Sequence, residues 1–534
     1  MAKNPLKNLV QGAFILTLAA FIAKVLSAVY RVPLQNFVGD EGFYVYQQVY
    51  PFYGLAMTLA LTGLPQFISK YVAEQHDPNE QTTVFAQLQT FICWLALALW
   101  ALVWFGSSLI AYLMGDLALE PVIQVASYTF LLIPPLTLYR GYLQGQFILV
   151  PTAVSQVVEQ FLRVGVILWA ALQFRYVGGW SIYQVSQVAM WGSFVGGVAA
   201  IGLLARAHHR AGFRAFGWTW RALSSWPKKT IRRRFLIEGG LVSLYSGYLI
   251  LFQLLDSFLL VNFLEKSGLT ATQARVEKGV FDRGQPLVQL GLVVALALST
   301  SFLPMLTKYL RENQPHAFLF STKLYLRLTT ALGLAASVGL ALVMPYMNYA
   351  LFKDQAGNTV LSVFVFAVAL MAVIQGYQSV AQSQNRLKAS IRAALLGLIM
   401  KGLLMPGLVY ILGTLGASLA TVVALATTLF LLVKQEQASI NHFWRERAFG
   451  WRLSAALGVM ILSLLLFNFS VARIFGELQQ RETALFLALL GVAVGLFSFM
   501  GTLLKFQVFT IREWLVLPFG KKILQGTRRK NEIR

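Results

Sequence analysis

Residues 91–114 read FICWLALALWALVWFGSSLIAYLM and include no charged side chain. A helix rises about 1.5 Å per residue, so about 20 such residues cross the hydrocarbon core of a bilayer. The apolar residues are consecutive rather than alternating with polar ones, which favours a helix over a strand of a membrane barrel. This stretch therefore predicts a membrane-spanning helix.

The same pattern recurs along the chain. Hydrophobic residues make up 57% of the 534 residues and charged residues only 12%, too few to cover the surface of a soluble protein of this length. Turn residues and charged clusters divide the sequence into about fourteen predicted spans. These are residues 9–34, 43–73, 84–114, 121–149, 152–175, 181–205, 235–264, 280–310, 317–352, 358–384, 390–413, 415–433, 452–475 and 483–506. The sequence thus predicts an all-α integral membrane protein.

Basic residues account for the net charge of +23. They concentrate after the sixth span, after the tenth span and in the C-terminal tail, which all follow even-numbered spans. The positive-inside rule therefore places these segments and both termini in the cytoplasm. The opposite loops begin with the acids Asp40, Glu41, Asp116 and Glu120. Because topology explains the charge, a nucleic-acid partner is disfavoured, whereas contact with anionic membrane lipids is expected.

An internal repeat occurs at a spacing of 238 residues, as between Lys70 and Lys308. The corresponding positions are LPQFISKY at 64–71 with LPMLTKY at 303–309, Gln47 with Gln285, Gln144 with Gln382, and Arg163 with Lys401. Each copy holds six spans, an even number, so the copies share one orientation in the membrane. The sequence predicts two parallel six-helix lobes facing a central cavity, as in alternating-access transporters. The predicted parts are an N-terminal lobe 1–205, a basic cytoplasmic linker 206–234, a C-terminal lobe 235–440, two additional helices within 441–506 and a basic tail 507–534.

Charged residues inside predicted spans are the candidate site residues, because a charge in a bilayer is costly unless it is paired or faces water. Lys24 and Arg31 are seven residues apart on the first helix and therefore share a face. Two cations on one face suit a polyanionic ligand. In the alternative interpretation, Arg31 reaches outward to Asp40 or Glu41, and Lys24 pairs with an acid on another helix.

Further charges lie in or beside the seventh and eighth spans. Lys278 and Asp282 are four residues apart and can neutralise each other, which leaves Arg283 without a local partner. Arg283 is then either a cavity residue or an anchor at the membrane interface. Asp256 lies in the middle of the seventh span. It is a counter-charge for Lys24, a structural residue or a site that couples transport to a cation.

The fifth span contains Glu159 and Arg163, which are four residues apart. This spacing favours a self-neutralised structural pair. Arg163 corresponds to Lys401 in the second copy, so a functional role is kept as the alternative.

Motifs for catalysis are absent from the sequence. There is no GxxxxGK[ST] phosphate loop, and the five histidines form no ligand-spaced cluster with the single cysteine, Cys93. No residues combine as a nucleophile and a base. The sequence therefore predicts a protein that is not an enzyme and uses no metal and no cofactor.

Two stretches resemble a known family: residues 12–74, which include YRVPLQNFVGDEGFYVYQQVY at 30–50, and residues 281–310, which begin FDRGQPLVQLG. They resemble the polysaccharide exporters that include stage V sporulation protein B and the MurJ-type lipid II flippases, in the multidrug/oligosaccharidyl-lipid/polysaccharide flippase superfamily. The resemblance covers nearly the whole chain. It implies a bacterial plasma-membrane flippase that moves undecaprenyl-diphosphate-linked sugars, chiefly lipid II, to the outer leaflet. It also implies a cationic cavity between helices one, two, seven and eight, and a lipid-tail groove within 441–506.

Individual positions can be carried over from the family. Arg31 and Arg283 match cavity arginines, and Asp40 matches an acid just after helix one. Lys24 stands where other members often have arginine, which keeps the charge but loses bidentate geometry. The family's helix-two arginine has no clear counterpart, and Gln47 lies in that region. The predicted cavity residues are Lys24, Arg31, Asp40, Gln47, Asp282 and Arg283, and the predicted coupling or counter-charge residues are Asp256, Glu159 and Arg163.

Sequence and resemblance together predict an alternating-access flippase for a lipid-linked saccharide, with lipid II as the favoured substrate. The expected partners are this lipid-linked oligosaccharide, membrane lipids and cell-wall synthesis proteins. One alternative is a cation-coupled drug or metabolite exporter of the same superfamily that depends on Asp256 or Glu159. Another is a scaffold of cell-wall assembly that transports nothing.

Overall fold

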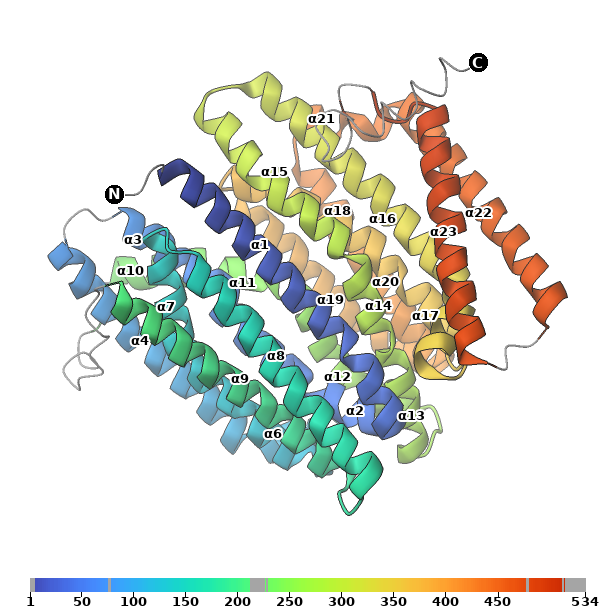
Figure 1. Cartoon of the computed structure of the whole chain (residues 1–534), viewed down its shortest axis with the longest axis horizontal. Coiled ribbons are helices and arrows are strands. Elements are labelled where there is room, and N and C mark those ends of the chain that lie inside the picture. Colours follow the sequence, from blue (N-terminus) through green and yellow to red (C-terminus); the bar gives the residue numbers. More distant parts are fainter. Residues whose placement is uncertain are drawn as a thin grey trace. The chain divides into compact units, whose positions relative to one another are not determined.

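The computed structural model describes residues 5–74, 78–211, 226, 229–476, 480–510 and 513, and the regular structure of these residues is helical throughout (Figure 1). Thirteen helical segments among them are long and apolar enough to cross a membrane. The first, Ile15–Val72, contains 58 residues, more than twice the roughly 20 residues of one crossing. It therefore accounts for the first two predicted spans. The all-α membrane fold with about fourteen spans is confirmed.

The first long segment is interrupted at Tyr30. Helix α1 (Pro5–Val29) ends one residue earlier, and α2 (Arg31–Thr58) begins one residue later. Pro33 has no N–H to donate to the carbonyl four residues before it, so the helical hydrogen-bond ladder is broken here. A second deviation lies inside α2 at Gly39, where φ is 73° and ψ is −178°, a backbone conformation that favours glycine.

The N-terminal part of the chain continues from α2 through a π-helical turn (Leu59–Gly63) into α3 (Leu64–Glu74). The helices that follow are α4 (Pro78–Phe105), α5 (Ser107–Leu113), α6 (Glu120–Ser127), α7 (Ile133–Gly145), α8 (Val150–Leu172), α9 (Ile182–Arg210), α10 (Lys229–Arg234), α11 (Gly240–Ser246), α12 (Tyr248–Lys266), α13 (Ala271–Asp282) and α14 (Gly284–Gly291). Short 3-10 or π-helical segments connect some of them, at Leu117–Leu119, Tyr128–Leu132, Gln173–Val177 and Phe235–Gly239.

The C-terminal part contains α16, the longest single helix among the described residues. Its elements are α15 (Val293–Arg311), α16 (Pro315–Phe352), α17 (Asn358–Phe364), α18 (Phe366–Ser383), α19 (Leu387–Leu412), α20 (Thr414–Gln435), α21 (Ala438–Asn441), a 3-10 turn (His442–Arg445), α22 (Arg447–Phe475) and α23 (Arg481–Lys505).

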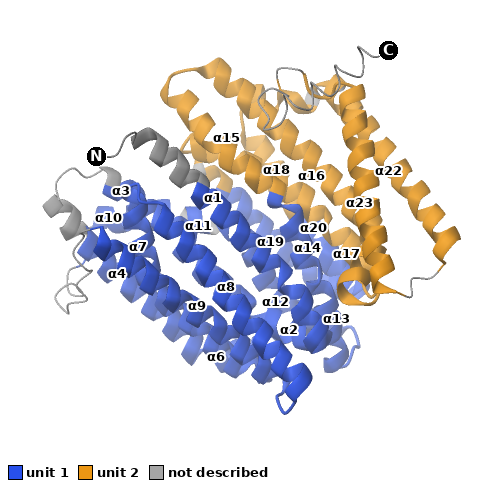
Figure 2. Cartoon of the chain, in the orientation of Figure 1, with its two compact units in different colours: residues 1–293, 391–424 blue, residues 294–390, 425–534 orange. Residues whose placement is uncertain are grey.

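The chain forms two compact units (Figure 2). Unit 1 contains Met1–Val293 and Ile391–Ala424, and unit 2 contains Val294–Ser390 and Leu425–Arg534. Unit 1 thus includes α11 to α14 and most of α19, which the sequence assigns to the C-terminal lobe. A division by compactness does not test an internal repeat, so the two-lobe organisation remains a prediction.

Glycines allow close packing of α8 against α9 in unit 1, where the two helices run side by side (Figure 1). A methyl group at Gly196 would lie 2.5 Å from the carbonyl oxygen of Glu159, and one at Gly192 would lie 3.0 Å from that of Arg163. Real side chains do not tolerate such contacts. The segment of α8 that carries Glu159 and Arg163 is therefore fixed tightly against α9.

In unit 2, α16 packs against α18, α22 and α23. Arg327 of α16 donates hydrogen bonds to Glu513 at 2.6 Å and to the carbonyl of Val508 at 2.7 Å. Its guanidinium also lies 4.5 Å from the ring centroid of Phe449 in α22. These contacts fix the chain that follows α23 against both helices.

Most of the predicted basic linker 206–234 and of the predicted tail 507–534 lies outside the described residues. At the described end of the linker, Arg234 lies 2.7 Å from Glu238, which also accepts a hydrogen bond from Lys70 of α3 at 2.9 Å. Partial burial raises the pKa of Glu238, but the hydrogen bonds from these two cations outweigh burial and hold that pKa below its usual range.

Candidate functional site

The stretch GFYVYQQVYPFYG at residues 42–54 of α2 is buried inside unit 1 rather than facing lipid. Tyr44, Tyr46, Tyr50 and Tyr53 are all buried there, and so is Tyr30 at the break before α2. A buried tyrosine contributes apolar area and a hydroxyl that needs a hydrogen-bond partner. Unit 1 therefore contains a row of polar hydroxyl groups among apolar rings.

Arg31, the first residue of α2, is completely buried, with 0% of its surface exposed. None of its three guanidinium nitrogens has a partner in hydrogen-bonding geometry among the described residues. The guanidinium carbon lies 4.5 Å from the ring centroid of Tyr50 and 5.9 Å from that of Tyr30. Such cation–π contacts compensate burial of the charge only in part. The interpretation that Arg31 reaches Asp40 or Glu41 is wrong, since other arginines bind these acids.

Arg163 of α8 approaches the same tyrosines. Its Nη2 donates to the hydroxyls of Tyr30 at 2.8 Å and Tyr46 at 3.1 Å. Its Nη1 donates to the hydroxyl of Tyr53 at 3.1 Å and to Oε1 of Gln160 at 3.0 Å. Neutral oxygens therefore satisfy most of this buried guanidinium, and its Nε has no partner among the described residues.

Glu159 pairs with Arg140 of α7, and not with Arg163. Nη2 of Arg140 lies 2.7 Å from Oε2 of Glu159, and both side chains are at most 1% exposed. The predicted pair of Glu159 and Arg163 is therefore wrong. Their spacing on the helix permits the pair, but α7 presents a competing cation to the carboxylate. Arg163 is left without a carboxylate partner among the described residues.

Arg283 and Asp40 form a bidentate ion pair. Arg283 lies between α13 and α14, three residues before Pro286, which breaks the hydrogen-bond ladder as Pro33 does. Its Nε and Nη2 donate to the two carboxylate oxygens of Asp40 at 2.9 and 2.5 Å, and Gln35 donates a third hydrogen bond to Asp40 at 2.9 Å. The structure thus brings two predicted cavity residues together. The charge of Arg283 is compensated in this conformation.

A close approach of α13 to α2 lies beside this ion pair. A methyl group on Gly279 would overlap the backbone carbonyl oxygen of Asp40. Gly279 is one helical turn before Arg283, so the missing side chain lets α13 come near enough for Arg283 to reach Asp40.

A second group of charges connects α12, α13 and α19. Nζ of Lys278 lies 2.6 Å from both carboxylate oxygens of Asp282, as their spacing predicts. Nζ of Lys401 lies 2.7 Å from Oδ1 of Asp256, and both side chains are buried. Asp256 is therefore the counter-charge of Lys401, and the prediction that it compensates Lys24 is wrong.

Lys24 and Gln47 are the remaining predicted cavity residues. Lys24 is exposed, whereas Arg31 is buried, so the two predicted cations lie in different surroundings. Gln47 is buried, and its Oε1 has no hydrogen-bond partner among the described residues.

The buried tyrosines and Arg275 are not among the residues that the sequence predicts for the site. Nη2 of Arg275 in α13 lies 3.2 Å from Asp116, and its Nη1 lies 3.7 Å from Glu41, which ties the loop acids to α13. The high density of tyrosines between residues 44 and 53 is a sequence signal that could have identified the tyrosines as site residues. Arg275 lies between the seventh and eighth predicted spans, where a basic residue carries no such signal.

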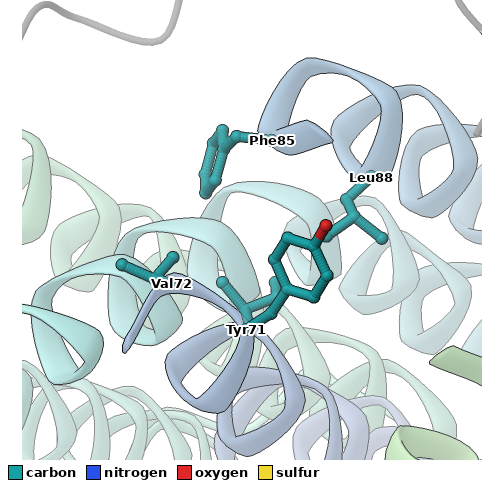
Figure 3. A pocket seen from close by; sticks show the side chains of 5 residues that line it. Tyr71, Val72, Phe85 and Leu88 are labelled. Carbon is teal, nitrogen blue, oxygen red and sulfur yellow. The ribbon is translucent and has the colours of Figure 1, made fainter. Parts of the chain in front are cut away.

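A small apolar pocket elsewhere in unit 1 is lined by Ile68, Tyr71 and Val72 of α3 and by Phe85 and Leu88 of α4 (Figure 3). None of these side chains is charged, so the pocket does not suit an anion. Among the described residues, no group of three or more His, Cys, Asp or Glu side chains is placed to hold a metal ion.

The sequence has relatives along its whole length. The family described as polysaccharide biosynthesis protein matches residues 9–310. The chain is 33% identical over 525 residues to the uncharacterized membrane protein YabM of Bacillus subtilis (strain 168), covering 98% of this chain and 97% of the relative. It is 24% identical over 523 residues to the lipid II flippase MurJ of that organism, covering 92% and 94% of the two chains. It is also 25% identical over 464 residues to stage V sporulation protein B, covering 81% and 83%.

Solved structures share the fold. A lipid II flippase MurJ in an inward closed conformation matches with a TM-score of 0.68 at 14% identity, over 92% of this chain and 99% of that chain. An inward-facing multidrug resistance MATE family transporter of the MOP superfamily matches with a TM-score of 0.59 at 15% identity, over 80% and 96%. With the family match and the 33% identity to YabM, this shows that the protein belongs to the polysaccharide biosynthesis protein family, within the flippase superfamily of MurJ and stage V sporulation protein B.

Proposed function

We propose that this protein is an alternating-access flippase for an undecaprenyl-diphosphate-linked saccharide, with lipid II as the favoured cargo. The proposal rests on the family and on one observation, the buried guanidinium of Arg31 without an anion. A buried cation that lacks a counter-charge destabilises the empty protein. The diphosphate of a lipid-linked saccharide would supply the missing negative charge.

The chemistry of the guanidinium group supports a phosphorylated ligand. Its planar donors form two parallel hydrogen bonds to a phosphoryl group, and lysine offers no such fork. Arg283 makes this kind of contact to the carboxylate of Asp40. In the proposed cycle, a diphosphate replaces Asp40 at Arg283 and neutralises Arg31. The ligand then favours one state of the protein over the other, which transport by alternating access requires.

Several finer features belong to this proposal. The two six-helix lobes would move around the headgroup, while the helices within 441–506 would hold the lipid tail. Both termini are placed in the cytoplasm, and transport runs from the cytoplasmic to the outer leaflet of the bacterial plasma membrane. These features are supported by the repeat, the basic loops and the family resemblance.

The alternative of a cation-coupled exporter needs a carboxylate that can bind the coupling ion. Lys401 lies against Asp256, and Arg140 lies against Glu159, so both candidate acids have a buried counter-charge from the chain itself. This arrangement favours the flippase. A transport-inactive scaffold is separated from both transporters by the experiment below.

The test uses a bacterial strain in which this protein is the only flippase of its kind. Arg31→Ala and Arg283→Ala are each expected to abolish growth and to leave lipid-linked saccharide in the cytoplasmic leaflet, because each removes a proposed phosphate contact. Arg175→Ala is the matched control, since this arginine is exposed after α8. Full growth with both cavity variants would contradict the proposal. Purified protein that moves no labelled lipid II in vesicles would support the scaffold instead.

A further inference from the structure

Two cations of unit 1 lie close to Tyr50. The guanidinium carbon of Arg31 lies 4.5 Å from the centroid of this ring, and that of Arg163 lies 5.6 Å from it. The two guanidinium carbons can therefore be no farther apart than the sum of the two distances. We call Arg31, Tyr50 and Arg163 the Tyr50 cluster.

The carboxylates that could neutralise this cluster are bound elsewhere. The buried and partly buried acids near these helices pair with other cations: Asp40 with Arg283, Asp116 with Arg275, Glu159 with Arg140, Asp256 with Lys401 and Asp282 with Lys278. Within the described part of the chain, no carboxylate therefore forms an ion pair with Arg31 or Arg163.

The hydrogen-bond pattern of the site shows an excess of donors. All three nitrogens of Arg31 and Nε of Arg163 lack acceptors among the described residues. The hydroxyl of Tyr46 accepts from Tyr30 and from Arg163, and that of Tyr53 accepts from Gln160 and from Arg163. Each of these two hydroxyl groups still has its own hydrogen to donate. A ligand that fits here carries acceptors only and a negative charge, as a phosphoryl group does.

We propose that the Tyr50 cluster is a phosphoryl-binding subsite for the second phosphoryl group of a lipid diphosphate, and that Arg163 is a ligand-binding residue. The inference rests on the proposed function and adds a subsite to it. Arg31 enters this subsite from the first position of α2, where it lies against the ring of Tyr50. Arg283 then binds the other phosphoryl group once Asp40 is displaced.

The tyrosines position Arg163 without neutralising it. A carboxylate in their place would hold the guanidinium equally well but would compete with the ligand for its charge. Hydroxyl groups hold the fork by neutral hydrogen bonds and leave the charge available. Two nearby cations repel each other in the empty site, and a dianionic group between them removes this repulsion.

The experiment measures binding to the purified full-length protein in detergent with three probes: undecaprenyl diphosphate, undecaprenyl phosphate and inorganic pyrophosphate. Wild-type protein is expected to bind the diphosphate lipid more tightly than the monophosphate lipid. Arg163→Gln should weaken binding of the diphosphate lipid roughly 10- to 100-fold, because a charge-assisted contact is lost. Binding of the monophosphate lipid should stay near the wild-type value, which also shows that the variant is folded.

Matched variants separate ligand binding from structural support. Arg175→Gln, an exposed arginine beyond α8, should leave all affinities unchanged. Tyr53→Phe keeps the ring and removes one hydroxyl, so it should weaken diphosphate binding by less than Arg163→Gln. If Arg163→Gln does not fold, the wild-type preference and Tyr53→Phe decide the question.

Each remaining outcome contradicts a different statement. Equal wild-type affinity for the two lipids, or equal weakening of both by Arg163→Gln, overturns the second subsite and leaves the proposed function standing. Inorganic pyrophosphate that binds as tightly as the diphosphate lipid makes the soluble anion the ligand and overturns the assignment to a lipid headgroup. Wild-type protein that binds neither lipid overturns the proposed function, and the inference with it.

Discussion

The pair of Asp256 and Lys401 offers a sharp test of how buried charge acts in this protein. Nζ of Lys401 lies 2.7 Å from Oδ1 of Asp256, and the two side chains are 0% and 2% exposed. Lys401 also donates to the backbone carbonyl of Phe252 at 3.1 Å. The perturbations are Asp256→Asn, Lys401→Met and the double variant with both changes.

The distance between the two charges sets the expected change in the free energy of unfolding. Two unit charges at 2.7 Å attract each other by about 6 kcal/mol at an effective dielectric constant of about 20. Most of this attraction offsets the cost of removing both charges from water. A single variant leaves one buried charge alone and is expected to lower the free energy of unfolding by about 3–5 kcal/mol. The double variant leaves neither charge, so its stability should return to within about 1–2 kcal/mol of wild type.

Unfolding of the purified protein by increasing SDS in mixed micelles, followed by tryptophan fluorescence, measures these changes. Lys308→Met is the matched control, because Lys308 forms an exposed pair with Glu312 at 3.7 Å. It should change stability little. A double variant as unstable as either single variant would refute the reasoning, since the loss would then come from shape or from other contacts.

The same double variant also tests a role of Asp256 in cation coupling. If the pair is structural, the stable double variant should still flip lipid in vesicles. A double variant that is stable but inactive would contradict the structural interpretation and would restore the cation-coupled alternative.

Three further changes probe other contacts. Glu159→Gln leaves Arg140 buried without its carboxylate and should lower the free energy of unfolding by about 3–5 kcal/mol, measured by the same SDS titration. Gly279→Ala should separate α13 from α2 at Asp40. It should therefore reduce lipid flipping in vesicles more than it reduces the free energy of unfolding. An unchanged flipping rate would show that the close approach of the two helices is unnecessary. Arg327→Ala should release the chain after α23, so that limited proteolysis cuts there faster than in wild type, and an unchanged cleavage rate would contradict this anchoring.

Rules that depend only on residues close together in the sequence predicted the helices of this fold well. The charge-free stretches marked the membrane spans, and the spacing of Lys278 and Asp282 predicted their ion pair. Both inferences depend on residues close together in the sequence, where the geometry of one helix suffices. The gap between the first two predicted spans, residues 35–42, contains the distortion at Gly39 but not the interruption at Tyr30, which lies within the first predicted span.

Contacts between helices could not be predicted in the same way. Asp40 and Arg283 are 243 residues apart, so no spacing rule connects them. Glu159 had a cation four residues away on its own helix but pairs with Arg140 on the next one. Which partner a buried charge finds depends on how the helices pack, and that depends on small residues such as Gly196 as much as on the charges.

The interruptions at Tyr30 and Arg283 have a mechanical consequence. A helix that already lacks a ladder hydrogen bond at one point bends there with little further loss. The 25 residues of α1 rise about 38 Å, so a bend of roughly 10° at Tyr30 would displace the far end of α1 by about 7 Å. The guanidinium of Arg31 lies beside this bend. A shift of less than an ångström at the bend therefore moves the distant end of α1 several times farther.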